Sequence, residues 1–314
     1  MNWKPWHLLI KPSTLEFTRQ SRRLRGFSLW DWLHGYVYAR WTYLYIGTGI
    51  GSNLLSRILK PLLRLTSSLG PKVGPNDSPR SSVADTYHGK VVPLESARQL
   101  VTIHEDVRFP NLEQIIPYPK ARDLILQNPE HIVVLDCPCR SARKDPCLPL
   151  DVCLIIGEPF ASFVTEHHKN RSRWITATEA VEILKAEDAR GHAHHAFFKD
   201  VMLGRFYAIC NCCSCCCGAI QAHHSGSPML ASSGYVASVD EEQCLGCGTC
   251  ADYCQFNALS LTVEGFALID SNLCMGCGVC EDKCPNEAIS LLRMPEKGMP
   301  LEIKALMDQA VSGT

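Results

Sequence analysis

Residues 240–261, DEEQCLGCGTCADYCQFNALSL, and residues 270–291, DSNLCMGCGVCEDKCPNEAISL, are two copies of one sequence. Aligned at an offset of 30 residues, they match at 11 of 22 positions. The matches include all four cysteines and both glycines between them, so that each copy reads C-x2-C-x2-C-x3-C. An internal duplication of this kind predicts two similar structural units, each organised around its own cysteines.

The cysteine spacing favours an iron–sulfur cluster in each unit. Three thiolates on one tight loop can each reach one iron of a [4Fe–4S] cubane, and glycines permit the positive φ values that this close approach needs. These glycines are Gly246, Gly248, Gly276 and Gly278. Tetrahedral zinc is the alternative for four thiolates, but zinc sites usually separate their cysteine pairs by about a dozen residues or more. Here seven residues hold three cysteines, twice over.

The duplicated segment resembles the bacterial two-cluster ferredoxin, in which the fourth cysteine of each run ligates the other cluster. The resemblance implies one [4Fe–4S] cluster on Cys244, Cys247, Cys250 and Cys284. It implies a second [4Fe–4S] cluster on Cys274, Cys277, Cys280 and Cys254. The proline that follows the fourth cysteine in that family is present as Pro285, whereas Gln255 follows Cys254. Two strand-like runs separated by Gly265 favour a small ferredoxin-like unit of β-hairpin and helix with pseudo-two-fold symmetry.

The cysteine content sets the redox environment that we expect. The chain of 314 residues has 18 cysteines and a net charge of −1. Its first residues, MNWKPWHLLIKPSTLEF, contain no apolar run long enough for a cleavable signal peptide. We therefore expect a cytoplasmic protein, either free or associated peripherally with the inner face of the membrane, in which the thiols serve metal or redox chemistry rather than disulfides. No uncharged apolar stretch is long enough to predict a spanning helix.

We expect an α+β protein in five parts. The parts are a basic aromatic helical segment (1–65), a Gly/Pro/Ser-rich linker (66–82), a mixed α/β middle domain rich in cysteine (83–235), the two-cluster module (236–292) and a helical tail (293–314). In the middle domain, HIVVLDCPC predicts a strand that ends at Cys137, and FYAIC predicts a second strand. TATEAVEILKAEDARG predicts a helix capped by Thr176 or Thr178 and ended by Gly191.

Ten further cysteines lie in the middle domain, in two groups. The first group is Cys137, Cys139, Cys147 and Cys153, and the second is Cys210, Cys212, Cys213, Cys215, Cys216 and Cys217. The two predicted strands lead into the two groups, so we expect the groups to meet at one place. The leading interpretation is one or more additional [4Fe–4S] or other iron–sulfur clusters ligated from both groups. Zinc, and thiols that are simply buried, are the alternatives.

The same region resembles a set of dicluster ferredoxin-type proteins of anaerobic bacteria and archaea. The resemblance lies in C-x-C-R, then E-A-x-x-I-L, then I-C-N-C-C-x-C-C. The matching residues are Cys137, Cys139, Arg140, Asp145, Cys147, Cys153, Glu179, Ala180, Ile183, Leu184, Ile209, Cys210, Asn211, Cys212, Cys213, Cys215 and Cys216. The resemblance implies electron transfer in anaerobic metabolism, but it does not say which cysteines are ligands.

The N-terminal segment is basic and aromatic. Residues 1–64 hold ten Lys or Arg and two acidic residues. Five of the six tryptophans lie here: Trp3, Trp6, Trp30, Trp32 and Trp41. This composition suits an anionic membrane surface, a membrane protein or another protein partner, and internal packing of the aromatic rings is the alternative. We expect no nucleic-acid binding, because no recognisable module accompanies the aromatic residues.

Other chemistries find no support. There is no C-x-x-C-H, no P-loop and no dinucleotide-binding glycine motif in its strand and helix context. We expect the histidines at 167–168, 192–195 and 223–224 to be exposed polar residues. No acid–base pair can be selected, so catalytic residues stay unknown.

The sequence thus predicts an electron-transfer iron–sulfur protein that serves a redox partner protein, as a carrier or as a subunit of an oxidoreductase. The alternative is a reductase whose catalytic metal or cluster centre, in the middle domain, receives electrons from the ferredoxin clusters. A third hypothesis is a protein that handles metal or thiols during assembly, which would show labile metal and no reversible redox couple.

Overall fold

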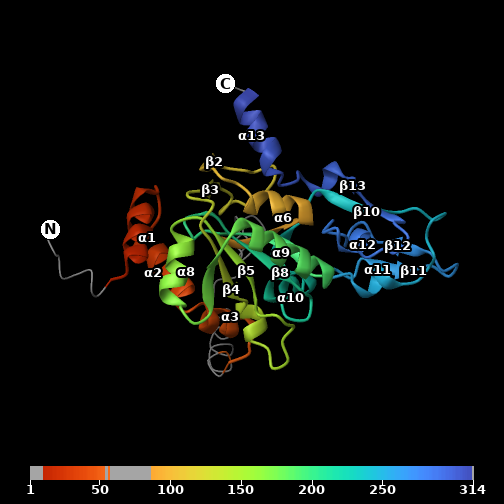
Figure 1. The fold of residues 1–314 in the computed structure, drawn as a ribbon, viewed down its shortest axis with the longest axis horizontal. Helices are drawn as coiled ribbons and strands as arrows, with labels where there is room; N and C mark the ends of the chain where they lie inside the picture. Colours follow the sequence, from red (N-terminus) through yellow and green to blue (C-terminus); the bar gives the residue numbers. More distant parts are fainter. Residues whose placement is uncertain (1–9, 54–55, 57–85, 313–314) are drawn as a thin grey trace, which may run out of the picture.

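The computed structural model describes residues 10–53, 56 and 86–312, so the predicted linker at 66–82 lies outside the described residues. The fold is α+β, with a large mixed sheet in the middle of the molecule and the cysteine repeat at one end (Figure 1). None of the described helices is long and apolar enough to cross a membrane.

The central sheet has seven strands. Their spatial order is β6 (Ser172–Ile175), β4 (Ile132–Asp136), β5 (Asp151–Ile156), β8 (Arg205–Cys212), β7 (Ala193–Lys199), β1 (Tyr87–Val92) and β9 (Leu230–Ala231). All neighbours are antiparallel except β1 and β9. A separate pair is formed by β2 (Val107–Phe109) and β3 (Leu124–Leu126). The predicted strands at 131–137 and 206–210 are confirmed as β4 and β8, and β8 runs two residues further into the cysteine run.

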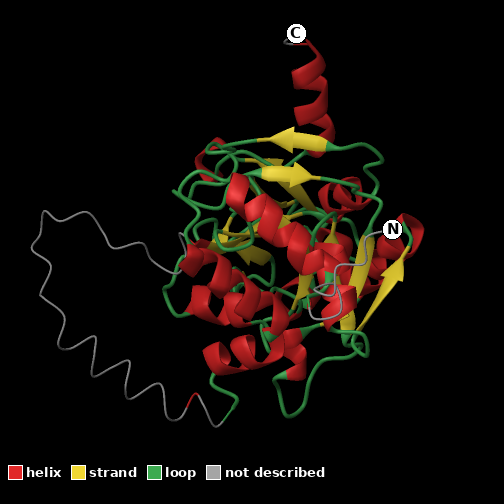
Figure 2. Ribbon diagram, turned by 90° about the vertical axis from the view of Figure 1, so that its left-hand side faces the viewer, coloured by secondary structure: helices red, strands yellow, loops and turns green. Residues whose placement is uncertain are grey.

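Helices cover both faces of the sheet, because its central strands are apolar on both sides (Figure 2). One face packs against α6 (Leu94–Val101), α9 (Ala177–Ala189) and α13 (Ile303–Ser312). The other face packs against α1 (Pro12–Arg23), α2 (Leu29–Arg40), α8 (Phe160–His167) and α10 (Gly218–His224). Six cysteines of the middle domain belong to or pack against the core on this second face, which the N-terminal helices help to form: Cys137, Cys139, Cys153, Cys210, Cys212 and Cys217.

Helix α9 is the predicted helix of the middle domain. The Thr176 side chain accepts a hydrogen bond from the backbone N–H of Glu179, which caps the first turn. The chain leaves the helix through Gly191, which has a φ of 78°. Leu184 is fully buried against the sheet. The helix therefore begins and ends where its capping residues predict.

The N-terminal helices α1, α2 and α3 (Thr42–Ile50) use some of their aromatic residues for packing and leave others exposed. Tyr38 is buried, and the Trp32 indole donates a hydrogen bond to the Thr18 hydroxyl. In contrast, Leu29 and Trp30 at the start of α2 are 80% and 77% exposed. Trp3 and Trp6 lie outside the described residues. Internal packing thus explains only part of the aromatic content.

The cysteine repeat forms a small unit of paired strands and single-turn helices. β10 (Tyr235–Val239) pairs with β13 (Ile289–Arg293), and β11 (Leu259–Leu261) pairs with β12 (Ala267–Ile269) across the turn that holds Gly265. The single-turn helices are α11 (Thr249–Asp252) and α12 (Val279–Asp282). The remaining short elements are α7 (Pro138–Ser141) and a 3-10 turn at Pro295–Lys297.

Candidate metal centres

The eight cysteines of the repeat line two separate cavities of about 20 Å³ each. The first, which we call the distal cavity, is lined by Cys244, Cys247, Cys250 and Cys284. The second, the proximal cavity, is lined by Cys254, Cys274, Cys277 and Cys280. Each cavity takes three cysteines from one copy of the repeat and the fourth from the other copy. This is the grouping that the resemblance implies, and each set offers four thiols to one cluster.

The two cavities differ in their exposure to solvent. Cys247 and Leu245, at the distal cavity, are exposed. At the proximal cavity Cys274 and Cys280 are buried, and burial raises the pKa of the Cys277 thiol to about 12. Two further lining residues of the proximal cavity, Phe256 and Met275, belong to the same hydrophobic core as the central sheet. The distal cavity therefore lies near solvent, and the proximal cavity lies against the middle domain.

The ten middle-domain cysteines are brought to one edge of the sheet. β4 and β8 are both antiparallel to β5, which lies between them, so they run parallel and end at the same edge. Cys137 follows β4, and Cys210 and Cys212 lie at the end of β8. A cavity of about 80 Å³ at this edge is lined by cysteines of both groups. The expected convergence of the two groups is confirmed.

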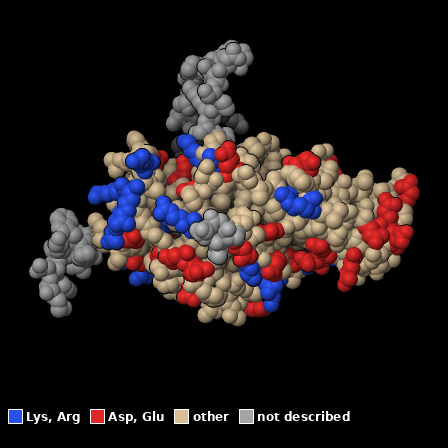
Figure 3. All heavy atoms as spheres, turned by 90° about the horizontal axis from the view of Figure 1, so that it is seen from above, with Lys and Arg blue, Asp and Glu red and all other residues tan. Residues whose placement is uncertain are grey.

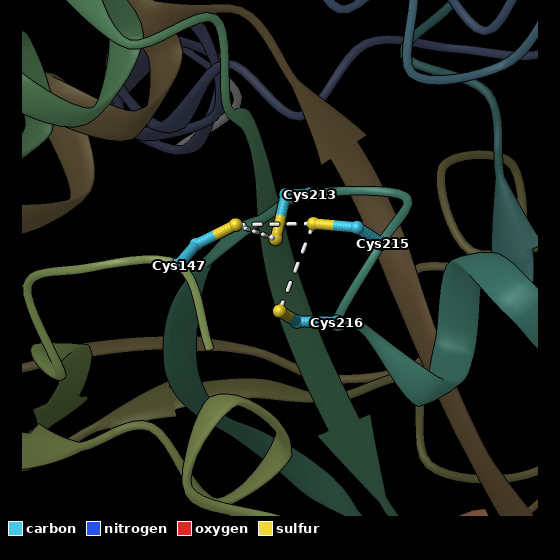
Figure 4. Close-up of side chains that lie close together, drawn as sticks. All are labelled: Cys147, Cys213, Cys215 and Cys216. Carbon is cyan, nitrogen blue, oxygen red and sulfur yellow. Dashed lines mark hydrogen bonds between the residues drawn. The ribbon is translucent and has the colours of Figure 1, made fainter. Parts of the chain in front are cut away.

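Four of these cysteines form a compact outer quartet: Cys147, Cys213, Cys215 and Cys216 (Figure 4). Their sulfur atoms all lie within 4.8 Å of one another. The Cys147 sulfur lies 3.0 Å from that of Cys215 and 3.7 Å from that of Cys213. Cys215 is exposed, so the quartet lies at the surface.

The turn that carries three members of the outer quartet is held by side-chain hydrogen bonds. The Arg143 guanidinium donates to the carbonyl of Cys216 at 2.9 Å and to the side-chain oxygen of Gln221 at 2.6 Å. The Gln221 amide in turn donates to the carbonyl of Cys215 at 2.9 Å. These bonds fix the backbone of the turn without any contribution from the thiols. The quartet is therefore positioned by its surroundings.

The other six cysteines form an inner ring around the 80 Å³ cavity: Cys137, Cys139, Cys153, Cys210, Cys212 and Cys217. Each thiol interacts with the next one in the series Cys210, Cys153, Cys137, Cys139, Cys217, Cys212. Hydrogen bonds from two neighbouring thiols lower the pKa of Cys137 well below its ordinary value. Among the described residues, no three of the six sulfur atoms lie as close together as those of the outer quartet.

The rest of the inner cavity is apolar apart from a few polar groups. Tyr38 of α2 and Tyr207 of β8 face each other, with 2.6 Å between their hydroxyl oxygens. Burial raises the pKa of both phenols, which are therefore neutral at ordinary pH. Thr42 and Ile46 of α3 complete this side of the cavity. The N-terminal helices thus separate the inner ring from solvent.

Arg140 ties the two cysteine groups together. Its side chain is 1% exposed and forms an ion pair with the equally buried Glu187 of α9. The same guanidinium donates to the carbonyl of Pro149, ahead of β5, and to that of Asn211 between two cysteines of β8. Burial alone would raise the pKa of Glu187, but the His192 hydrogen bond and the Arg140 charge outweigh it and lower the pKa. Sequence reasoning noted Arg140 only as part of a motif, without a role.

The expectation of exposed histidines at 192–195 is wrong. His192 is 7% exposed, and His194 and His195 are fully buried. They enter or lie on β7, an interior strand of the sheet that is buried on both faces. His194 contacts the side-chain oxygen of Asn211 at 2.6 Å, and burial lowers the pKa of His195 to about 3. Of the other histidines in these three stretches, His224 is exposed as expected, while His167, His168 and His223 are half-buried.

Gln255, where the ferredoxin family has proline, connects the repeat to the cysteine run. Its side-chain oxygen accepts a hydrogen bond of 2.7 Å from the backbone N–H of Ser214, inside the turn of the outer quartet. Its amide donates to the carbonyl of Gly191 at 2.7 Å. Gln255 directly follows Cys254, which lines the proximal cavity. A proline side chain could make neither bond, so the departure from the family pattern has a structural reason.

Replacing this glutamine with alanine tests the connection. We expect Gln255→Ala to destabilise the protein by about 1–3 kcal/mol, because the Ser214 N–H and the Gly191 carbonyl lose their partner in a site that is 9% exposed. Anaerobic thermal denaturation measures the effect. Gln243→Ala is the matched control, since the Gln243 amide bonds only the exposed Asp240 carboxylate. Equal losses of stability in the two variants would show that the two hydrogen bonds of the Gln255 side chain contribute nothing to stability.

These features define an iron–sulfur protein with a role in electron transfer: a duplicated four-cysteine motif, two four-thiol cavities and a cysteine-rich sheet edge beside them. Comparison with known families agrees. Residues 237–291 match the family model of the 4Fe–4S dicluster domain, so the C-terminal unit is a ferredoxin-type 2[4Fe–4S] module. No curated protein matches the chain. The family match covers the repeat alone, and the remaining cysteines have to be interpreted from their geometry.

Proposed function

We propose that this protein transfers electrons through two [4Fe–4S] clusters in its module to or from a further iron–sulfur centre in the middle domain. The distal cluster would be held by Cys244, Cys247, Cys250 and Cys284, and the proximal cluster by Cys254, Cys274, Cys277 and Cys280. The proximal cavity carries the proposal, because its wall belongs to the hydrophobic core that also contains the cysteines of the sheet edge. A cluster there would stand between the distal cluster and the middle domain.

The distal cluster would exchange electrons with a partner protein. It is the more exposed of the two, and the segment 237–291 holds nine Asp or Glu against one Lys. Figure 3 shows acidic side chains gathered at the end of the molecule that holds the module. Charge complementarity therefore favours a partner with a basic face, since such a field steers association.

Anaerobic iron and acid-labile sulfide analysis, with EPR of the dithionite-reduced protein, tests the assignment. We expect Cys247→Ser with Cys250→Ser to remove about four irons, and Cys277→Ser with Cys280→Ser to remove the other four of the module. Each pair should abolish one EPR signal and leave the other. A pair that changes neither iron content nor spectrum would refute its ligand set, and a protein without a reversible couple would be a metal-handling protein instead.

We also propose that the N-terminal helices dock the protein to an anionic membrane surface. At the corner between α1 and α2, the basic residues Arg22, Arg23 and Arg25 are exposed beside Leu29 and Trp30. Exposed basic residues next to an exposed tryptophan suit an anionic lipid interface. Sedimentation with anionic vesicles but not with neutral ones is the expected result. Unchanged sedimentation of Arg22→Glu with Arg23→Glu would contradict the proposal.

A reductase is the second candidate function. The observation that favours it is the cavity beside the inner ring, where the facing hydroxyl groups of Tyr38 and Tyr207 are among the few polar groups of a largely apolar wall. An iron atom without a thiolate ligand in this cavity would leave a position for a small substrate. Spectroscopic shifts on adding small oxidised molecules to the reduced protein would support this candidate, and full thiolate ligation would exclude it.

A further inference from the structure

The ten middle-domain cysteines fall into two sets that differ in the distances between their sulfur atoms. These distances indicate whether a set suits a single metal ion or an iron–sulfur cluster. A single tetrahedral ion with metal–sulfur bonds of about 2.3 Å places its four sulfur atoms about 3.8 Å apart. In a cubane each thiolate binds a different iron, so the four sulfur atoms stand farther apart. The sulfur separations thus distinguish a mononuclear site from a cluster site.

The outer quartet has the dimensions of a mononuclear site. The sulfur–sulfur distances of 3.0, 3.7 and 3.7 Å lie near the tetrahedral value, and all pairs fall within 4.8 Å. Even the shortest is far longer than a disulfide bond of about 2.05 Å. The module supplies an internal comparison: among the described residues, no three cysteines of either module cavity lie within 4.8 Å of one another. The quartet is therefore narrower than the sets assigned to cubanes.

The inner ring is wider than the outer quartet and suits a cluster rather than a single ion. It offers six thiols where a cubane needs four, and its cavity of about 80 Å³ compares with about 20 Å³ for each module cavity. Its sulfur atoms are spread around the cavity, as those of the module are. The wall is closed by α2 and α3 and contains Arg140 as its buried cation. A positive charge beside the thiolates would offset part of the negative charge of a cluster.

We propose that the middle domain holds two metal centres: a single tetrathiolate ion on the outer quartet, and in the inner ring a polynuclear iron–sulfur cluster with more iron than one cubane. The inference rests on the proposed function and specifies its middle-domain centre. Zinc and iron both suit a tetrahedral set of four thiolates. Cys213 and Cys216 of the quartet also line the inner cavity, so the two centres would share a wall.

The ratio of metal to acid-labile sulfide separates the two centres, because a mononuclear ion carries no sulfide. We expect the intact anaerobic protein to hold more than about twelve irons besides the outer ion, eight of them in the module. Cys147→Ser with Cys215→Ser should remove one metal ion, zinc or iron by elemental analysis, and no sulfide. Cys139→Ser with Cys210→Ser should remove more than four irons together with their sulfide and leave the outer ion.

Matched controls exclude a general loss of structure. Ser214→Ala changes the same turn as the outer pair without removing a thiol, and Ile155→Val changes the inner cavity wall. Both should keep the metal and sulfide content of the intact protein. The two EPR signals of the module report separately on the proposed function, since they should persist in every one of these variants.

Three results would overturn the inference. Loss of iron and sulfide in equal numbers from the outer variant would make the quartet a cluster site. A middle domain with four irons or fewer besides the outer ion would make the inner centre no larger than a cubane. Disulfides at the outer quartet, found by thiol titration of the intact protein without metal at these residues, would remove the mononuclear site.

Discussion

Arg140→Met lowers the stability of the middle domain by about 3–5 kcal/mol, because it leaves the Glu187 carboxylate buried without its main counter-charge. The substitution also frees the carbonyls of Pro149, ahead of β5, and of Asn211 in β8, which both accept hydrogen bonds from the guanidinium. For a domain of this size the loss corresponds to a decrease in Tm on the order of 10 °C. Anaerobic differential scanning fluorimetry measures it. Iron beyond that of the module should be lost as well, since the two cysteine groups lose their common support.

Arg190→Met is the matched control for this prediction. Arg190 pairs with the other oxygen of the same carboxylate at 3.0 Å, but its side chain is 44% exposed. Exposed ion pairs contribute about 0–1 kcal/mol, so this variant should stay close to the intact protein in Tm and in iron content. Equal decreases in Tm and iron content in the two variants would mean that the burial of Arg140 adds nothing to the stability that its ion pair provides.

The second large effect is expected at Gly276, in the loop of the proximal cavity. Gly276 has a φ of 64°, and a side-chain Cβ there would overlap the carbonyl oxygen of Tyr235 and the hydroxyl of Ser233. Tyr235 is held in register by its pairing with Arg293, so the backbone cannot easily retreat. Gly276→Ala should therefore displace Cys277 and remove the proximal cluster. The expected readout is loss of about four irons and of one EPR signal.

Gly265→Ala separates this steric effect from the cost of a positive φ. Gly265 lies in the same module with a φ of 92°, and a Cβ there would meet no atom within 4 Å. Alanine at a position of positive φ costs about 1 kcal/mol, which should leave both clusters in place. Gly246→Ala should instead remove the distal cluster, because its Cβ would overlap the carbonyl of Gly265. Retention of both clusters in Gly276→Ala would refute the close-approach argument.

Much of the architecture could be predicted because it depends on local signals. A β-branched run before Cys137 and a capping threonine at 176 determine where a strand and a helix lie, whatever packs on them. The burial of the histidines at 192–195 could not be predicted from such local signals. The sequence around them has no clear apolar periodicity, and they are buried because β7 lies inside the sheet.

The middle-domain sites depend on contacts between distant residues. Nothing in the spacing of the cysteine run indicates that Cys213, Cys215 and Cys216 gather with Cys147, while Cys210, Cys212 and Cys217 line the cavity without joining that quartet. That division follows from the point at which β8 ends and the chain turns. The role of Gln255 likewise appears only when the module lies against the run.

The sequence by itself determined the module. Its cysteines and glycines repeat at a fixed short spacing, and a loop of seven residues can present three thiols to one cluster without help from the rest of the chain. The tertiary structure alone decided how the other ten cysteines divide and which helices cover them. Those thiols come from strands and loops that meet only after the sheet has formed, so their grouping depends on strand order, which local spacing does not encode.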